Sequence, residues 1–216
     1  MHQSRGIFVC IDGPCGVGKT TTVQALGNRL RSVGLPIHLT AEPTNHDIGT
    51  LARARVHTDT SGHALACLFA ADRYERLHTE IRPRLAAGDI VVSDRYVAAG
   101  LVMQRLDGVD LDFLRAINAS ADPPDLAVIL TANPAVITQR LAQRGRHNRY
   151  QYSPDISADE TALYIDAADS LSATGVPVLR LETSLYPPDT LATMIHTRID
   201  ALRNDRHARP DTQAAS

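Results

Sequence analysis

Residues 13–20 read GPCGVGKT and match the pattern GxxxxGK followed by Ser or Thr at every fixed position. An apolar run over 7–11 precedes this stretch and a helical pattern over 20–33 follows it, as a phosphate-binding loop requires. The glycines of such a loop let backbone N–H groups converge on phosphate oxygens, and the helix N-terminus adds partial positive charge. The sequence therefore predicts a nucleotide site made by Gly13, Cys15, Gly16, Val17, Gly18, Lys19, Thr20 and Thr21.

The side chains around this loop predict phosphoryl transfer with ATP and Mg²⁺. Lys19 is expected to reach the β- and γ-phosphates, and the Thr20 hydroxyl to ligate the metal. Asp94 and Arg95 follow an apolar run over 90–93, and ligands bind at the carboxyl ends of parallel strands. Asp94 is predicted to hold Mg²⁺ directly or through water, and Arg95 to grip an acceptor phosphate. No N/TKxD motif marks a GTPase, so the chain is interpreted as a small-molecule kinase.

Short apolar runs alternate with longer helical patterns along the chain. Strands are predicted at 7–11, 37–40, 90–93, 126–131 and 176–181, and helices at 20–33, 48–55, 62–87, 111–121, 134–144, 158–174 and 188–204. Such alternation is typical of a parallel sheet covered on both faces. We expect an α/β, three-layer P-loop NTPase fold with a five-stranded parallel sheet, in one domain over 1–204. The polar stretch 146–157 is interpreted as a lid segment, and 205–216 as a disordered tail.

The composition excludes several other classes of protein. The chain has 216 residues, a net charge of −2 and 44% hydrophobic residues, so neither a nucleic-acid polymer nor another polyanion is an expected partner. Three scattered cysteines, Cys10, Cys15 and Cys67, favour a reducing cytoplasmic location over a disulfide scaffold or a zinc site. No apolar run approaches the ~20 residues that a membrane-spanning helix needs.

A base-binding pair is predicted on the helix over 62–87. Phe69 and Arg73 are four residues apart and therefore share a helix face, where the ring can stack on a base and the guanidinium can donate to it. Arginine has donors only, so it suits a base carbonyl, such as O4 of thymine or uracil, or the O6/N7 edge of guanine. From the spacing alone, a core phenylalanine and a surface arginine are the favoured interpretation.

Several motifs resemble the thymidylate kinase family over nearly the whole chain. They are TAEPT at 40–44, LFAADR at 68–73, AAGDIVVSDRY at 86–96, PPDLAVIL at 123–130 and the lid stretch Asn148-Arg149-Tyr150, together with GPCGVGKTT. The resemblance implies ATP-Mg as donor, a nucleoside monophosphate as acceptor and a homodimer. It places Phe69 on the base, Arg73 at O4 and Arg95 at the acceptor phosphate.

The resemblance also implies catalytic arginines in the lid, because the loop position after Gly16 is Val17 and carries no arginine. The candidates are Arg144, Arg146 and Arg149, with Arg149 joining Lys19 and Arg95 around the transferred group. The family's acidic residue before the loop glycine is Asp12, which is expected to orient the metal water or the acceptor.

The chain departs from the family pattern mainly on the acceptor side. The family's TREP reads Thr40-Ala41-Glu42-Pro43, the loop aspartate is Cys15, and the sugar-side positions are Gly100 and Met103. In the lid, the usual DR-x-E reads Asn148-Arg149-Tyr150-Gln151. Three interpretations follow: a thymidylate kinase with an altered pocket, a relative that acts on a modified nucleotide, or a degenerate enzyme. Because Met103 lacks a hydroxyl, weaker discrimination at the sugar 2′ position is expected.

Two rival functions are compatible with the sequence. A nucleoside kinase would need a carboxylate base near a neutral 5′-hydroxyl, and Asp12 and Glu42 are the candidates. A regulatory protein that binds nucleotide without turnover is disfavoured by the intact Lys19 and Asp94. The loop amides, Lys19 and the helix N-terminus favour a thiolate at Cys15, which predicts alkylation that ATP blocks; a small filler residue is the alternative.

Overall fold

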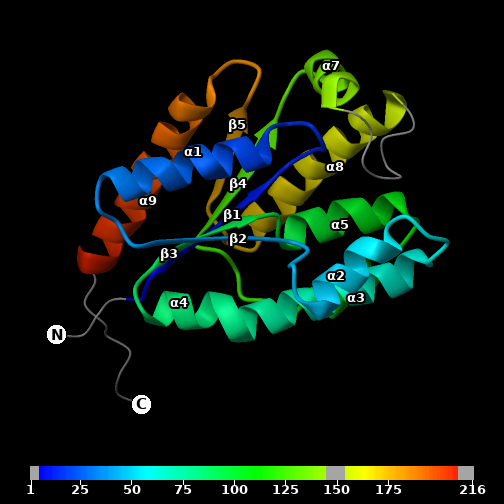
Figure 1. The fold of residues 1–216 in the computed structure, drawn as a ribbon, viewed down its shortest axis with the longest axis horizontal. Coiled ribbons are helices and arrows are strands. Elements are labelled where there is room, and N and C mark those ends of the chain that lie inside the picture. The colour runs from blue at the N-terminus through cyan, green and yellow to red at the C-terminus, as the bar shows by residue number, and fades with distance from the viewer. Residues whose placement is uncertain (1–4, 145–153, 209–216) are drawn as a thin grey trace.

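The computed structural model describes residues 5–144 and 154–208. Its centre is a parallel sheet with the strand order β2-β3-β1-β4-β5 (Figure 1). The strands span β1 Ile7–Asp12, β2 Ile37–Ala41, β3 Ile90–Asp94, β4 Leu126–Thr131 and β5 Val178–Glu182. The predicted five-stranded parallel sheet is confirmed, although the last strand begins two residues later than predicted.

Helices connect successive strands, because parallel strands are joined by crossover connections. Their bounds are α1 Lys19–Ser32, α2 Asp47–Arg55, α3 Gly62–Arg76, α4 Arg82–Ala86, α5 Val97–Leu106, α6 Leu111–Asn118, α7 Pro134–Arg144, α8 Pro154–Ala173 and α9 Pro188–Ala208. The helix predicted at 62–87 consists of α3, a π-helical turn η1 (Leu77–Ile81) and α4 in succession.

Three sequence predictions are corrected by these bounds. Helix α5 was not predicted, because the run VAAGLVMQRL is apolar without a polar face and follows directly on the DRY motif. Helix α9 continues to Ala208, so 205–208 belong to it and not to a disordered tail. Helix α8 begins at Pro154, so the last part of the predicted lid over 146–157 is helical. Residues 145–153 and 209–216 lie outside the described part of the chain.

Alternate residues of the central strands face two separate apolar layers. Ile7, Val9 and Ile11 of β1 pack with residues of α1 and α9, whereas Phe8 and Cys10 pack with residues of η1 and α4. The period of two along a strand produces this division. Helices α1 and α9 therefore cover one face of the sheet and η1, α4, α5 and α8 the other, as Figure 1 shows.

The carboxyl ends of β1, β3 and β2 lie side by side and carry the functional groups. Ile11 is paired with Asp94, and Asp94 with Ala41, so the ends of the three strands are in register. The phosphate loop leaves β1 at this edge, and α5 begins shortly after β3. Within the described residues, no helix combines the length and apolar character needed to cross a bilayer.

Candidate active site

The phosphate loop, residues 13–18, joins β1 to α1 and depends on three glycines with positive φ. The φ angles are 149° at Gly13, 79° at Gly16 and 106° at Gly18. A Cβ on Gly13 would lie 2.4 Å from the carbonyl oxygen of Leu130, and one on Gly16 would lie 2.9 Å from Cγ of Leu141. Glycine is therefore required both by the backbone conformation and by the close packing.

The Lys19 ammonium is folded back onto this loop. Nζ donates hydrogen bonds to the carbonyl oxygens of Gly13 and Pro14, at 2.7 and 2.8 Å. Burial, followed by the nearby Arg95 guanidinium, lowers the pKa of Lys19 to about 8. Phosphate oxygens at this position would stabilise the charged ammonium, so the loop is suited to an anionic ligand.

Thr20 and Asp94 come together as predicted. The Thr20 hydroxyl donates to Oδ2 of Asp94 at 2.6 Å, although the two residues belong to α1 and β3. One hydroxyl and one carboxylate are hard oxygen ligands, and Mg²⁺ in kinases binds few protein groups besides substrate phosphates and water. The donor set therefore fits Mg²⁺. Thr20, Asp94 and Lys19 line a cavity of about 780 Å³, which we call the loop cavity.

Arg95 lies beside the loop in a constrained conformation. Its φ is 74°, its N–H donates to the carbonyl of Ile11 at 3.0 Å, and its own carbonyl accepts from the Ser93 hydroxyl. The guanidinium approaches the Tyr164 hydroxyl at 3.5 Å and Sγ of Cys15 at 3.7 Å. A left-handed conformation is uncommon for a residue of this size and is typical of functional sites.

Asp12 has a different environment from the one predicted. Its carboxylate is fully buried, and Oδ1 accepts from the N–H groups of Tyr96 and Ala99, each at 3.1 Å. Oδ2 has no hydrogen-bond partner among the described residues, and burial raises the pKa of the group. Asp12 borders neither of the cavities described here. Its position favours capping the first turn of α5 over contact with metal or acceptor.

A second cavity, of about 170 Å³, adjoins the loop cavity and is called here the acceptor pocket. It contains all six residues predicted to bind the acceptor: Glu42, Phe69, Arg73, Arg95, Gly100 and Met103. Four residues border both cavities, namely Glu42, Pro43, Arg53 and Arg95. The tertiary structure thus places two guanidinium groups at the junction between a phosphate loop and an aromatic-lined pocket.

A buried ion network fixes Arg73 in this pocket. Arg73 donates to both oxygens of Glu42 at 2.9 and 2.7 Å, and Arg76 donates to one of them at 2.7 Å. Nη1 of Arg73 also donates to the side chain of Asn118, and both guanidinium groups lie over the ring of Tyr96. Because both oxygens of Glu42 are engaged, that carboxylate is not available as a general base.

The comparison with known proteins agrees with this geometry. A family model described as thymidylate kinase matches residues 11–172. The chain belongs to the thymidylate kinase family. A probable thymidylate kinase of Pyrococcus horikoshii is 36% identical over 205 residues, covering 92% of this chain and 96% of that protein. A probable thymidylate kinase of Pyrobaculum aerophilum is 37% identical over 147 residues, covering 67% and 74%. A thymidylate kinase of Xanthomonas oryzae pv. oryzae is 38% identical over 141 residues, covering 65% and 62%.

The structure shows the surroundings of two residues that depart from the thymidylate kinase pattern, Gly100 and Met103. A Cβ on Gly100 would lie 3.1 Å from Nη2 of Arg73, so the missing side chain leaves room for that guanidinium. Met103 packs with Cys15, and Val56 and Leu106 lie against the pair. The pocket wall near the loop is therefore apolar at the positions where this family carries polar residues.

Sequence reasoning missed one polar residue of the acceptor pocket. Gln104 lies on α5, is 3% exposed and borders the pocket. A polar side chain buried beside a cavity is placed to hydrogen-bond a ligand there. An amide also offers both a donor and an acceptor, which complements the donor-only Arg73. If α5 had been predicted as a helix, the spacing of four residues would have placed Gln104 one turn after Gly100, on the same face.

The loop cavity contains further residues that no motif indicated. Arg53 of α2 borders both cavities and donates to the carbonyl of Pro43 at 2.7 Å. Arg140 of α7 donates to the Val17 carbonyl at 3.0 Å and to the Thr183 hydroxyl at 2.9 Å. Tyr186, Pro188 and Leu191 also border the cavity near these groups. These residues extend the lining of the loop cavity beyond the phosphate loop itself.

The predicted lid arginines remain predictions. Arg146 and Arg149 lie outside the described residues, and so does the side chain of Arg144 at the end of α7. Arg140, one turn earlier on α7, is the arginine of this region that the structure places at the loop.

Proposed function

We propose that this chain transfers the γ-phosphoryl group of ATP to dTMP and forms dTDP. The observation that carries the proposal is the junction of the two cavities, where Arg53 and Arg95 face both. Guanidinium groups bind phosphate in fork geometry, so a junction with two of them suits an acceptor that carries its own phosphate.

The base end of the acceptor pocket supports a pyrimidine with a carbonyl at position 4. Arg73 supplies donors only, and Gln104 supplies one donor and one acceptor. Together they match a carbonyl next to a ring N–H, as in thymine. Phe69 provides the stacking surface for the base.

The proposed mechanism depends on position and charge. The loop amides and Lys19 hold the donor phosphates, while Arg95 and Arg53 hold the acceptor phosphate in line with them. Bound Mg²⁺ would neutralise the charge that develops on the donor phosphates, and Thr20 and Asp94 would hold it. Arg149 is proposed, from the family resemblance alone, to add a further positive charge. A homodimer and a cytoplasmic location are proposed on the same resemblance.

The rival nucleoside kinase is less well supported. It needs an unengaged carboxylate near a neutral hydroxyl, but both oxygens of Glu42 are bound by arginines. Asp12 is buried under α5 and borders neither cavity. A nucleoside would also carry no phosphate for the Arg53 and Arg95 guanidinium groups at the junction of the cavities to bind.

An acceptor screen with Mg-ATP tests the proposal. Phosphorylation of dTMP should be fastest, that of dUMP slower and that of dCMP and thymidine negligible. Arg53→Gln should raise the KM for dTMP by at least about tenfold, as expected for a lost charged hydrogen bond, with a smaller change in the KM for ATP. Faster turnover of thymidine than of dTMP would instead establish the nucleoside kinase, and no turnover of any acceptor would favour the regulatory protein.

A further inference from the structure

A buried carboxylate on α8 reaches the phosphate loop from a distant part of the chain. Glu160 is 3% exposed, and its Oε1 accepts a hydrogen bond from the N–H of Cys15 at 3.0 Å. The two residues are 145 positions apart in the sequence. Glutamate is rarely buried without a specific partner. The partner here is a backbone amide of the loop itself.

Helix α8 makes a second contact with the site one turn later. Tyr164 is fully buried, and its hydroxyl lies 3.5 Å from Nη1 of Arg95. The other end of the same guanidinium lies 3.7 Å from Sγ of Cys15. These contacts connect three parts of the chain: the loop at Cys15, the residue after β3 at Arg95, and α8 at Glu160 and Tyr164.

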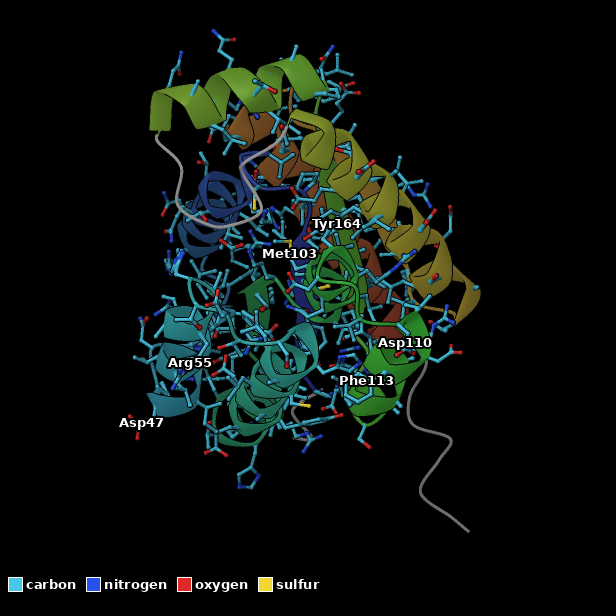
Figure 2. All side chains as sticks on the ribbon, turned by 90° about the vertical axis from the view of Figure 1, so that its right-hand side faces the viewer. Asp47, Arg55, Met103, Asp110, Phe113 and Tyr164 are labelled. Carbon is cyan, nitrogen blue, oxygen red and sulfur yellow. The ribbon has the colours of Figure 1, made fainter. Side chains whose placement is uncertain are left out.

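The body of α8 is well anchored, so it can serve as a support. Tyr164, Ala167 and Ala168 pack with Val102 of α5 and Ile129 of β4. Figure 2 labels Tyr164 on α8 and Met103 on α5, two helices that pack against each other. The loop is thus held between two packed helices, α1 behind it and α8 beside it.

The negative charge of Glu160 acts on the same groups that bind phosphate. It favours the charged forms of Lys19 and Arg95, as does Asp94 on the opposite side of the loop. These two cations face Glu160 from α1 and from the segment after β3. The carboxylate therefore has two separable effects, a hydrogen bond to the loop and a charge near the substrate phosphates.

We infer that Glu160 is a positioning residue: its hydrogen bond to the Cys15 amide fixes the loop against α8, so that the donor site and Arg95 keep one relative placement. The effect on turnover rests on the proposed function, whereas the effect on nucleotide binding does not. Without an acceptor at this position, a buried amide of the loop would lose its hydrogen bond, and the loop would relax from the conformation that binds phosphate.

Three variants separate the hydrogen bond from the charge. Glu160→Gln removes the charge and keeps an acceptor oxygen, while Glu160→Ala removes both. The difference between these two variants therefore isolates the hydrogen bond. Asp159→Asn, at the exposed neighbour on the same helix, removes an equal charge without a contact to the loop.

Binding of Mg-ADP measured by calorimetry is the primary readout, because it does not depend on the identity of the acceptor. Glu160→Ala should bind Mg-ADP at least about tenfold more weakly than Glu160→Gln, and its kcat with dTMP should fall by a similar factor. Glu160→Gln should bind equally well or more tightly than wild type, since a negative charge near the phosphates is gone. Asp159→Asn should match wild type.

Equal Mg-ADP affinities for the alanine and glutamine variants would overturn the inference. A loss of turnover in Glu160→Gln as large as in Glu160→Ala would also overturn it, because the charge would then be the important property. If Glu160→Ala lowers the melting temperature but leaves the Mg-ADP affinity unchanged, Glu160 only stabilises the fold and the inference is wrong. If wild type binds Mg-ADP but does not phosphorylate dTMP, the proposed function fails while the binding comparison still decides the role of Glu160.

Discussion

Glu42→Gln is expected to destabilise the whole domain strongly. The side chains of Glu42, Arg73 and Arg76 are only 3%, 2% and 0% exposed, so the two guanidinium groups share one buried carboxylate. The substitution keeps the shape of the side chain but leaves two buried positive charges without a counterion. Loss of one partner from a buried ion pair typically costs about 3–5 kcal/mol.

This loss converts into a large shift of the melting temperature. For a domain of about this size, 1 kcal/mol corresponds to roughly 2–4 °C, so Glu42→Gln should melt about 6–20 °C below wild type. Arg73 would also lose its fixed position in the acceptor pocket, which should raise the KM for dTMP. The measurements are thermal unfolding followed by circular dichroism and steady-state kinetics well below the transition.

A surface ion pair provides the matched control. Asp169 pairs with Arg180, and their side chains are 67% and 45% exposed. Surface pairs contribute about 0–1 kcal/mol, so Asp169→Asn should shift the melting temperature by less than about 4 °C. If Glu42→Gln melts no lower than Asp169→Asn, the reasoning about a buried ion network is refuted.

Four further outcomes are expected. Because burial lowers the pKa of Lys19 to about 8 and bound phosphate would favour its charged form, Mg-ATP affinity should be constant below pH 8 and fall above it. Calorimetry in buffers of different ionisation enthalpy should detect proton uptake on binding above pH 8; affinity that is independent of pH up to 9.5 would contradict this. Gly100→Ala should raise the KM for dTMP about tenfold by displacing Arg73, while the KM for ATP stays within about twofold. An unchanged KM for dTMP would show that the guanidinium moves without consequence. Because Met103 offers no hydroxyl near the sugar, the kcat/KM for UMP should lie within about tenfold of that for dUMP. A strict preference for the deoxynucleotide would contradict the importance of the apolar wall. Alkylation of Cys15 by iodoacetamide, followed by mass spectrometry, should be slowed by ATP; equal rates with and without ATP would refute a reactive thiol in the loop.

Local patterns were sufficient for the loop and the strands, and they indicated part of the acceptor pocket. Gly13, Gly16 and Gly18 all have positive φ angles, and the spacing of the motif indicated a loop of this kind at residues 13–18. Buried strands appear as apolar runs because both faces of the sheet are covered. Phe69 and Arg73 share a helix face by their spacing, and the structure places both in one pocket.

Other parts of the site depend on contacts between distant segments. Helix α5 lacks a polar face because α8 packs against one side of it and α3 and α6 against the others, so its sequence does not show the pattern of an amphipathic helix. The same packing buries Gln104 beside Arg73, which no local signal indicated. Asp12 was predicted to orient the metal water or the acceptor, and only the position of α5 shows that its carboxylate accepts two amide hydrogen bonds.

The sequence by itself determined where a phosphate could bind and which side chains could accompany it, because backbone conformation and helix periodicity are encoded within about ten residues. Only the tertiary structure decided which charges meet. The strand order β2-β3-β1-β4-β5 brings Glu42 to Arg73, Thr20 to Asp94 and Glu160 to Cys15, and no local pattern specifies that order. Long-range pairing is set by the burial of two helical layers on one sheet, which is a property of the whole chain.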